Sequence, residues 1–333
     1  MNVAMFSTKP YDQEYFEAYN EAYGFAITYF ETPLNSHTVN LTSGFEAVCV
    51  FVNDRIDAET IEAMGRNGVQ LIALRCAGFN NVDLQAAERQ QIKVVRVPAY
   101  SPEAVAEHSI ALILTLNRKT HKAYNRIREG NFSLHKLIGF NLHQKTVGVI
   151  GTGKIGAAFC RILKGFGCRI IAYDKFESNE LLGMGVQYRP LNTVFEQSDI
   201  LSLHCPLTED TKYIVNESSI GRMKKGVMII NTSRGALIKT EDVIEGLISQ
   251  KIGYLGIDVY EQEENLFFKD LSESIIQDEF ILRLNSFPNV LITSHQAFFT
   301  REAMAEITTT TLENINAFHR GEELLNALAY INL

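Results

Sequence analysis

Three short segments in the second half of the chain carry polar side chains that suit chemistry on a small acid. They read N-T-S-R-G, D-V-Y-E-Q-E and S-H-Q-A-F. Arginine binds a carboxylate through two parallel hydrogen bonds, so Arg234 is the candidate anchor for an acidic substrate. Histidine titrates near neutral pH, so His295 is the candidate acid/base. Glu263, bonded to the other ring nitrogen, would orient the imidazole and raise its pKa.

Each of these residues taken alone also has an ordinary structural explanation. An arginine in a loop, an acidic surface turn and a histidine at the end of a strand are all common. Their joint placement favours chemistry, because each follows an apolar run that predicts a strand, at residues 227–231, 255–259 and 290–293. Doubly wound sheets bind their ligands at the carboxyl ends of their strands. We therefore expect the three side chains at one edge of a sheet.

A glycine-rich loop earlier in the chain has the pattern of a dinucleotide-binding site. The apolar run 147–150 predicts a short buried strand, and G-T-G-K-I-G follows it directly. The glycines permit a tight turn, a close approach to pyrophosphate, and close packing of the next helix. The first N–H groups of that helix would face the phosphates. The predicted cofactor-binding residues here are Gly151, Gly153, Lys154, Ile155 and Gly156.

The residue after the second strand of this unit predicts which dinucleotide is bound. The strand at residues 169–173 leads into Asp174. A carboxylate at this point accepts hydrogen bonds from the adenosine ribose hydroxyls and repels a 2′-phosphate. We therefore predict NAD rather than NADP, with Lys175 as the neighbouring cation that would weaken the preference.

An NAD site beside an arginine, a glutamate and a histidine suits hydride transfer to a 2-keto acid. The arginine would hold the substrate carboxylate. The histidine would donate a proton to the keto oxygen as hydride reaches the adjacent carbon. The substrate class predicted from these residues is therefore a small 2-keto or 2-hydroxy acid.

The composition is that of a globular chain large enough for two domains. It has 333 residues, 46% of them hydrophobic, and a net charge of −8, which argues against a nucleic-acid partner. Its five cysteines are scattered in apolar runs, which favours buried free thiols over disulfides and indicates a reducing cytoplasm. We find no signal peptide, membrane span or metal-ligand spacing, and predict no membrane partner and no metal.

The alternation of apolar and helical segments predicts an α/β fold with two parallel sheets. Five apolar runs precede the glycine-rich loop and predict a first small domain, at residues 3–6, 26–30, 47–52, 71–74 and 94–97. After the loop, strands at 200–204, 227–231, 255–259 and 290–293 would complete a doubly wound sheet. The segment 265–288 mixes polar, acidic and aromatic residues and is predicted to be a loop or a lid.

Two longer helices are expected around these sheets. A helix over residues 103–118 follows Ser101 and Pro102, a cap with proline at the first helical position, and would link the domains. Its apolar part, 110–116, is either buried within one subunit or a contact between subunits. The final helix, 302–320, is expected to pack on the first domain, with the run Thr308–Thr311 packed inside it.

Seven motifs along the chain are more specific than the glycine-rich loop alone. They are F-S-T-K-P-Y-D, L-R-C-A-G-F-N-N-V-D, V-P-A-Y-S-P-E-A-V-A-E-H, H-C-P-L-T, N-T-S-R-G, D-V-Y-E and H-Q-A-F. With them, essentially the whole chain resembles the NAD-dependent D-2-hydroxyacid dehydrogenase family, and within it the bacterial members that form D-lactate. The resemblance implies two doubly wound parallel-sheet domains. A Rossmann cofactor domain, residues 100–298, would be inserted into a discontinuous flavodoxin-like substrate domain, residues 1–99 and 299–333.

The resemblance also implies roles for individual residues. Arg234 would bind the substrate carboxylate, with His295 as the acid/base and Glu263 as its partner. The backbone of Ala77 and Gly78 would help to hold the carboxylate, and the substrate pocket would be lined by Tyr100 and Phe298. Further cofactor contacts would come from His204, Cys205, Pro206, Thr232 and Asp258, the last at the nicotinamide carboxamide. Family members pair through helices of the cofactor domain, so we expect a homodimer or homotetramer.

Two alternative functions remain open at this point. A 2-keto acid reductase of the D-2-hydroxyisocaproate type would share the catalytic set and differ in the size of its pocket. An NAD-sensing interaction protein, similar to corepressors of the same fold, would keep the three residues with little or no turnover. We favour the enzyme that forms D-lactate.

Overall fold

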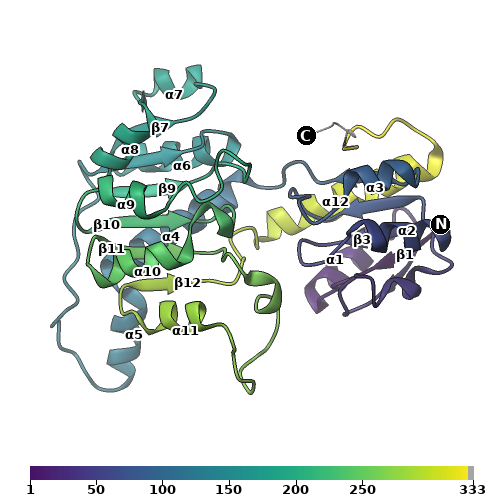
Figure 1. The fold of residues 1–333 in the computed structure, drawn as a ribbon, viewed down its shortest axis with the longest axis horizontal. Helices are drawn as coiled ribbons and strands as arrows, with labels where there is room; N and C mark the ends of the chain where they lie inside the picture. The colour runs from purple at the N-terminus through teal and green to yellow at the C-terminus, as the bar shows by residue number, and fades with distance from the viewer. Residues whose placement is uncertain (329–333) are drawn as a thin grey trace. The chain divides into compact units, whose positions relative to one another are not determined.

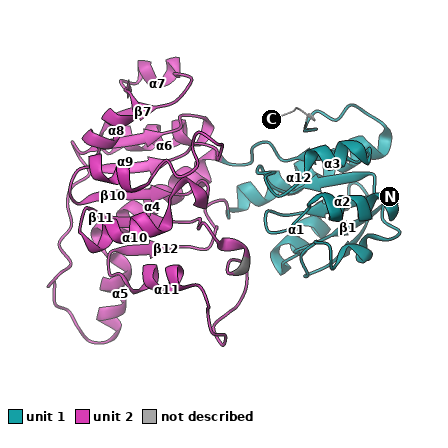
Figure 2. Cartoon of the chain, in the orientation of Figure 1, with its two compact units in different colours: residues 1–101, 299–333 teal, residues 102–298 magenta. Residues whose placement is uncertain are grey.

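The computed structural model describes residues 1–328, without the side chain of Asn265. The chain folds into two compact units, Met1–Ser101 with Phe299–Leu333, and Pro102–Phe298 (Figures 1 and 2). It therefore leaves the first unit once and returns to it after the second is complete. The predicted boundaries lay between residues 99 and 100 and between residues 298 and 299.

The first unit contains a five-stranded parallel sheet in the order β2-β1-β3-β4-β5. Its strands are β1 (Asn2–Met5), β2 (Ala26–Tyr29), β3 (Ala47–Val50), β4 (Leu71–Leu74) and β5 (Lys93–Arg96). They are connected by α1 (Pro10–Asn20), the 3₁₀ turn η1 (Val39–Thr42), α2 (Ala58–Arg66) and α3 (Leu84–Arg89). Strands β3 and β4 are buried along their whole length, which is typical of central strands covered on both faces.

Helix α12 (Arg301–Arg320) completes the first unit. It contacts α1, β4 and β5, and its Leu312 and Ile315 are fully buried in the core that those strands form. Thr308 and Thr311 are also fully buried. The expectations that the final helix packs on the first domain and that its threonine run lies in a packed helix are confirmed.

The second unit contains a seven-stranded parallel sheet in the order β12-β11-β10-β9-β6-β7-β8. Its strands are β6 (Thr146–Ile150), β7 (Arg169–Tyr173), β8 (Gln187–Tyr188), β9 (Ile200–Leu203), β10 (Val227–Asn231), β11 (Ile252–Ile257) and β12 (Val290–Ile292). The chain runs from β6 outwards to β8 and then starts again at β9 on the other side of β6. Ligands of doubly wound sheets bind beside such a reversal, at the carboxyl ends of the strands.

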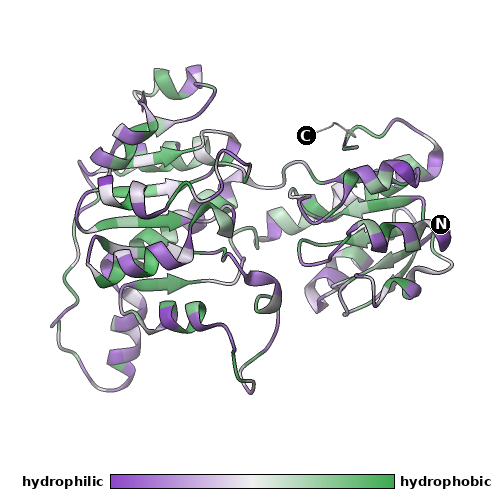
Figure 3. Cartoon of the chain, viewed as in Figure 1, coloured by the Kyte–Doolittle hydropathy of each residue, from purple (hydrophilic) through white to green (hydrophobic). Residues whose placement is uncertain are grey.

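Helices cover both faces of this sheet. One core forms with α4 (Pro102–Arg118), α6 (Lys154–Gly165) and α7 (Asn179–Gly183). The other forms with α8 (Leu191–Gln197), α9 (Glu217–Arg222), α10 (Thr240–Ile248) and α11 (Glu279–Ser286). The strands of both sheets are hydrophobic, whereas most helices have a hydrophobic and a polar face (Figure 3). The predicted fold of two doubly wound parallel sheets is confirmed.

The apolar segment of α4 contributes four side chains to the core of the second unit. Ile110, Leu112, Ile113 and Leu116 are buried against β-strand and α6 residues of the same chain. These four side chains therefore belong to the core of one subunit, whereas Ala111 on the same helix is exposed and Leu114 and Thr115 are partly exposed. Helix α5 (Thr120–Arg128), which follows, has no buried residue.

The segment 265–288 is only partly the loop that we predicted. Residues 279–286 form α11, whose Ile281 and Leu284 are buried in the second unit. Asp278 caps this helix, since its carboxylate accepts from the backbone N–H of Phe280 and Ile281. The loop expectation failed here because the helix is short and buries only two residues, which leaves little periodic signal.

The five cysteines, Cys49, Cys76, Cys160, Cys168 and Cys205, are all buried and none forms a disulfide. This agrees with the predicted free thiols. Across residues 1–328, the helices are all too short or too polar to cross a bilayer.

Candidate active site

The glycine-rich loop lies at the point where the strand order of the second sheet reverses. Gly151 directly follows β6 and has a φ of +93°, which favours glycine. A Cβ there would lie 2.5 Å from the backbone of both His204 and Cys205. A Cβ on Gly156 would lie 2.1 Å from the carbonyl oxygen of Gly151. Only glycines at these two positions allow the loop to fold this closely against the turn after β9 and against itself.

The start of α6 is open in the way that a phosphate site requires. Gly153 is the N-cap residue and no side chain caps the helix. A Cβ on Gly153 would meet no atom within 4 Å. The first N–H groups of the helix, at Lys154 and Ile155, therefore remain for a ligand, and the helix dipole favours an anion there.

Asp174 follows β7 and lies beside the same loop. Its Oδ2 accepts from the Thr152 N–H at 2.5 Å and from the Thr152 hydroxyl at 3.1 Å. The exposed Lys175 is paired with Asp210, Nζ to Oδ2, at 2.7 Å. The cation that would weaken a preference for NAD is therefore bound to a carboxylate other than Asp174.

The turn after β9 carries the residues predicted for the adenine side. The His204 ring lies 4.7 Å from the Phe159 ring, and its Nε2 is 2.9 Å from the Ser202 hydroxyl. Its Nδ1 is buried and has no hydrogen-bond partner in the described part of the chain. Burial lowers the pKa of His204 to about 3, so the ring is neutral at physiological pH. Cys205 and Pro206 follow; the carbonyl of Cys205 accepts from the Ser233 hydroxyl at 2.7 Å.

Arg234 sits in a turn that its neighbours hold tightly. The Asn231 amide at the end of β10 donates to the Arg234 carbonyl at 2.9 Å and accepts from the Ser233 N–H at 3.1 Å. The half-buried guanidinium donates to the Ser233 carbonyl at 2.7 Å. Thr232 is buried, with its hydroxyl 2.8 Å from that of Ser109 on α4.

Gly235 lies where this turn contacts the backbone of the segment after β11. A Cβ on Gly235 would lie 2.1 Å from the carbonyl carbon of Tyr260 and 2.5 Å from the nitrogen of Glu261. Two chain segments that carry candidate catalytic residues thus touch through their backbones. Nothing in the sequence marks this glycine, because its requirement arises from a contact between residues distant in sequence.

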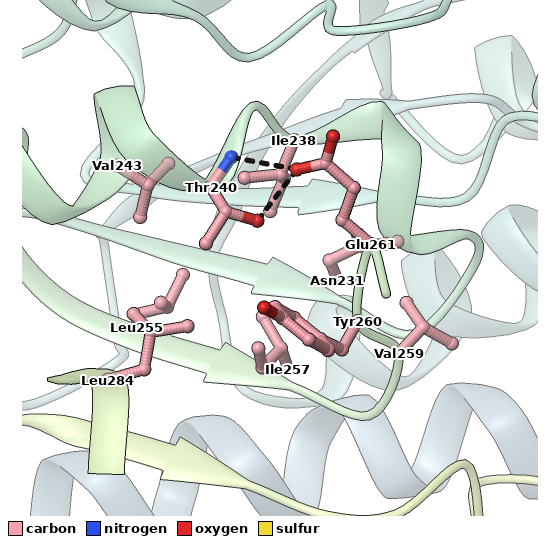
Figure 4. Close-up of a pocket in the computed structure, with 11 residues that line it drawn as sticks. Asn231, Ile238, Thr240, Val243, Leu255, Ile257, Val259, Tyr260, Glu261 and Leu284 are labelled. Atoms are coloured by element: carbon pink, nitrogen blue, oxygen red, sulfur yellow. Dashed lines mark hydrogen bonds between the residues drawn. The ribbon is translucent and has the colours of Figure 1, made fainter. Parts of the chain in front are cut away.

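Hydrogen bonds of the Glu261 carboxylate also hold the segment after β11 in place. Its Oε2 accepts from the Thr240 hydroxyl at 2.9 Å and from the Thr240 N–H at 3.2 Å, as Figure 4 shows. Its Oε1 accepts from the Tyr213 hydroxyl. The cavity beside it has about 10 Å³ and is lined mostly by apolar residues, including Val243, Leu255 and Leu284. At most one water fits, so this cavity is a packing defect rather than a substrate site.

His295 and Glu263 form the predicted pair. The histidine Nδ1 is 2.8 Å from the glutamate Oε1, and the glutamate Oε2 accepts from the Tyr260 N–H at 3.0 Å. Because a carboxylate only accepts, Nδ1 carries the proton. Within residues 1–328 the His295 Nε2 has no hydrogen-bond partner. This nitrogen is the one left for a substrate.

Asp258, predicted at the nicotinamide, is buried and bonded to the turn around His295. Its Oδ1 accepts from the Gln296 N–H at 2.9 Å and its Oδ2 from the Ala297 N–H at 2.8 Å. Its Oδ1 also accepts from the Thr293 hydroxyl at 2.5 Å. This second role is not predictable from the sequence, because nothing in the motif indicates where the carboxylate points.

The remaining predicted substrate residues belong partly to the first unit. Ala77 and Gly78 follow β4, and their N–H groups donate to no acceptor in the described chain. Their carbonyls are occupied, by the Arg96 guanidinium and the Cys76 thiol. Tyr100 is half-buried in this unit, and Phe298, at the end of the second unit, is buried.

A buried arginine that the sequence analysis did not identify supports the loop after β4. Arg75 is 1% exposed and donates to the carbonyls of Phe6 and Ser7 at 3.0 and 2.9 Å. Its Nη2 lies 3.4 Å from a carboxylate oxygen of Asp12. Burial raises the pKa of the neighbouring Asp54 carboxyl, although the positive charge of Arg75 acts to lower it. The carboxyl ends of β1 and β4 are thus tied together just before Ala77.

Comparisons with known proteins agree with this architecture. Residues 110–297 match the family model for the NAD-binding domain of D-isomer specific 2-hydroxyacid dehydrogenases. The chain is 53% identical to D-lactate dehydrogenase of Escherichia coli, over 98% of this chain and all of that protein. The apo structure of the E. coli enzyme superposes with a TM-score of 0.90 at 50% identity, covering 99% of this chain and 100% of that one.

Two further solved structures extend the comparison. The pyruvate reductase of Chlamydomonas reinhardtii has a TM-score of 0.91 at 45% identity, with 98% of each chain covered. A D-2-hydroxyisocaproate dehydrogenase has a TM-score of 0.84 at 30% identity, with 98% of this chain and 99% of that chain covered. The chain belongs to the D-isomer specific 2-hydroxyacid dehydrogenases, NAD-dependent oxidoreductases whose substrates are small 2-hydroxy and 2-keto acids.

Proposed function

We propose that this protein is a D-lactate dehydrogenase, which reduces pyruvate to D-lactate with NADH and catalyses the reverse reaction. The observation that carries the proposal is the His295–Glu263 pair at 2.8 Å, with the His295 Nε2 unbonded in the described chain. The similarity to D-lactate dehydrogenase of E. coli over nearly the whole chain supports pyruvate as the substrate. It also supports the D configuration of the product.

The roles of the catalytic residues follow from their chemistry. When bound, NADH supplies the hydride. Arg234 binds the substrate carboxylate, because its planar guanidinium matches the two oxygens. His295 donates its Nε2 proton to the keto oxygen, and Glu263 keeps the ring oriented and stabilises the imidazolium. In the direction of lactate oxidation, the same nitrogen accepts the proton.

The remaining site residues are proposed to bind the cofactor or to shape the substrate pocket. The loop Gly151–Gly156 and the start of α6 suit a pyrophosphate, because their N–H groups have no side-chain cap. Asp174 lies where the adenosine ribose is expected. We assign the adenine side to His204, Cys205 and Pro206, the nicotinamide side to Thr232 and Asp258, and the substrate to Ala77, Gly78, Tyr100 and Phe298.

The test is NADH oxidation by the purified protein with a panel of 2-keto acids. Pyruvate, 2-ketoisocaproate, phenylpyruvate and glyoxylate are compared at matched concentrations, and the lactate formed is analysed for its configuration. A clear preference for pyruvate with D-lactate as the product supports the proposal. L-lactate, or no turnover of any acid in the panel, contradicts it.

A second candidate is a reductase of bulkier 2-keto acids. The similarity to a D-2-hydroxyisocaproate dehydrogenase, at a TM-score of 0.84, favours it as the alternative. The same panel separates the two, because a preference for 2-ketoisocaproate keeps the mechanism and changes the substrate.

We further propose a homodimer or homotetramer that works in the cytoplasm during fermentation. Helix α5 and the segment after it expose several large apolar side chains, namely Tyr124, Ile127, Phe132, Leu134 and Ile138. Large apolar side chains exposed in one segment are a feature of interaction surfaces. Light scattering on the wild type and on the variant Phe132→Glu tests the assembly. A wild type that is a dimer or tetramer, with a variant shifted towards the monomer, supports the proposal, and a monomeric wild type contradicts it. The five free thiols suit a reducing compartment.

A further inference from the structure

The backbone of His295 adopts a conformation that histidine does not favour. Its φ is +52°, in the left-handed region. Residues other than glycine rarely adopt such a conformation, and it persists where the surrounding structure imposes it. The proposed reaction nevertheless requires an imidazole at this position. Hydrogen bonds around the turn must therefore hold the residue in place.

Asp258 supplies most of those hydrogen bonds. Its backbone carbonyl accepts from the His295 N–H at 2.7 Å. Its carboxylate accepts from the next two N–H groups, those of Gln296 at 2.9 Å and Ala297 at 2.8 Å. One aspartate thus binds three successive N–H groups of the turn. The orientation of its carboxylate decides how firmly the turn is held.

Thr293 and His108 in turn fix that carboxylate. The Thr293 Oγ1 is 2.5 Å from the Asp258 Oδ1 and 3.0 Å from the His108 Nε2. The carboxylate can only accept, so the single hydroxyl proton goes to Asp258 and the threonine oxygen accepts from His108. The His108 Nε2 is 3.5 Å from the Asp258 Oδ1, so Thr293 relays this contact.

The hydrogen bonds from His108 through Thr293 to Asp258, called the relay below, connect α4 to the turn. His108 lies on α4, which is packed against β10 and β11, and Thr293 directly follows β12. Asp258 is 1% exposed, and in residues 1–328 it has no lysine or arginine within ion-pair distance. A buried carboxylate in that situation depends on its hydrogen bonds, so each donor strongly affects where it points.

We infer that Thr293 and His108 are positioning residues for His295. They fix the Asp258 carboxylate, which holds the His295 turn in its left-handed conformation and so keeps the ring bonded to Glu263. The inference rests on the proposed role of His295 as the acid/base. Thr293 and His108 act through the Asp258 carboxylate and not through contact with the reacting atoms.

The test uses a pair of substitutions at Thr293 with a matched control. Thr293→Val removes the hydroxyl at nearly constant volume, and Thr293→Ser keeps it. Thr308→Val is the control, because Thr308 is a fully buried threonine in α12 whose hydroxyl has no partner in the described chain. We measure kcat and KM for pyruvate, and follow amide hydrogen exchange of residues 294–298 in the holoenzyme.

We expect Thr293→Val to lower kcat by about 10- to 100-fold, the scale of a misplaced catalytic group, with little change in the KM for pyruvate. The Gln296 and Ala297 amides should exchange faster. Thr293→Ser should restore kcat and protection, and Thr308→Val should resemble the wild type in both. His108→Leu, which removes only the outer donor, should shift both measurements in the same direction by a smaller factor.

Wild-type kcat and protection in Thr293→Val overturn the inference, as does a Thr293→Ser variant that is equally impaired. A His108→Leu variant that matches the wild type removes His108 from it. If the wild-type protein reduces no 2-keto acid, the proposed function fails. Amide exchange then decides alone whether the relay holds the turn.

Discussion

Replacing Gly235 with alanine tests how the carboxylate anchor is held relative to the acid/base pair. The added Cβ would lie 2.1 Å from the Tyr260 carbonyl carbon, where ordinary contacts begin at 3.4 Å. The two segments must therefore separate by about 1.3 Å, the difference between these distances. The crowding atoms belong to the backbone, so no side-chain rotation can relieve the contact.

The separation affects both halves of the site. Arg234 immediately precedes Gly235, and the Tyr260 N–H donates to the Glu263 carboxylate at 3.0 Å. Moving one segment by about 1 Å therefore displaces the carboxylate anchor from the proton donor. Misplacement on this scale costs roughly 100-fold in rate. We expect kcat/KM for pyruvate to fall about 100-fold, equivalent to about 2.7 kcal/mol of transition-state stabilisation.

Steady-state kinetics with pyruvate and NADH measure the effect, with circular dichroism to verify that the variant is folded. Gly165→Ala serves as the control, because Gly165 lies in the last turn of α6 and a Cβ there meets no atom within 4 Å. The control should keep the wild-type kcat/KM. A folded Gly235→Ala variant whose kcat/KM stays within about twofold of the wild type would refute the reasoning. It would show that a displacement of about 1 Å between Arg234 and the acid/base pair does not slow the reaction.

Three further predictions address single residues. Arg234→Lys should raise the KM for pyruvate despite keeping the charge, because an ammonium cannot form the planar fork; an unchanged KM would remove the anchor. His295→Gln should lower kcat by about 2–4 orders of magnitude, and a near-normal rate would exclude it as the acid/base. The pKa of His204 lies at about 3 in the folded protein, against an ordinary value of 6.5 for the unfolded chain, so protonation favours unfolding and stability is lost as pH falls below about 6.5. From about pH 7 to pH 5 this costs about 2 kcal/mol, so urea unfolding should show His204→Gln losing less stability than the wild type over that range; equal losses would contradict it.

The parts of the fold that the sequence predicts well are those written in local patterns. The four-residue strand β4 and the strand β7 have the predicted bounds, because each is an apolar run between polar segments. The glycines at 151 and 156 are also local signals, and the structure supplies the close contacts that make them necessary. Helix α11 and strand β8 are missed because each is too short for a period to appear.

In the candidate site, too, some residues can be predicted from local sequence and others cannot. Residue type and position after a strand are enough to select Arg234, Glu263 and His295, since few side chains can bind a carboxylate or move a proton at neutral pH. The residues that hold them have no such signature. Gly235 matters because of a backbone that lies 25 residues further along the chain, and glycine alone does not reveal a distant contact.

The relay to His295 shows why positioning residues escape a reading of the sequence. His108 and Thr293 are 185 residues apart and share a hydrogen bond only because α4 packs beside β12. Histidine near a helix start and threonine after a strand each have many ordinary uses. What gives them a role is the strained backbone of His295, a property of the folded chain that residue type does not encode. The kind of reaction is therefore predictable from the residue types present. The positions of the catalytic groups depend on contacts that only the tertiary structure defines.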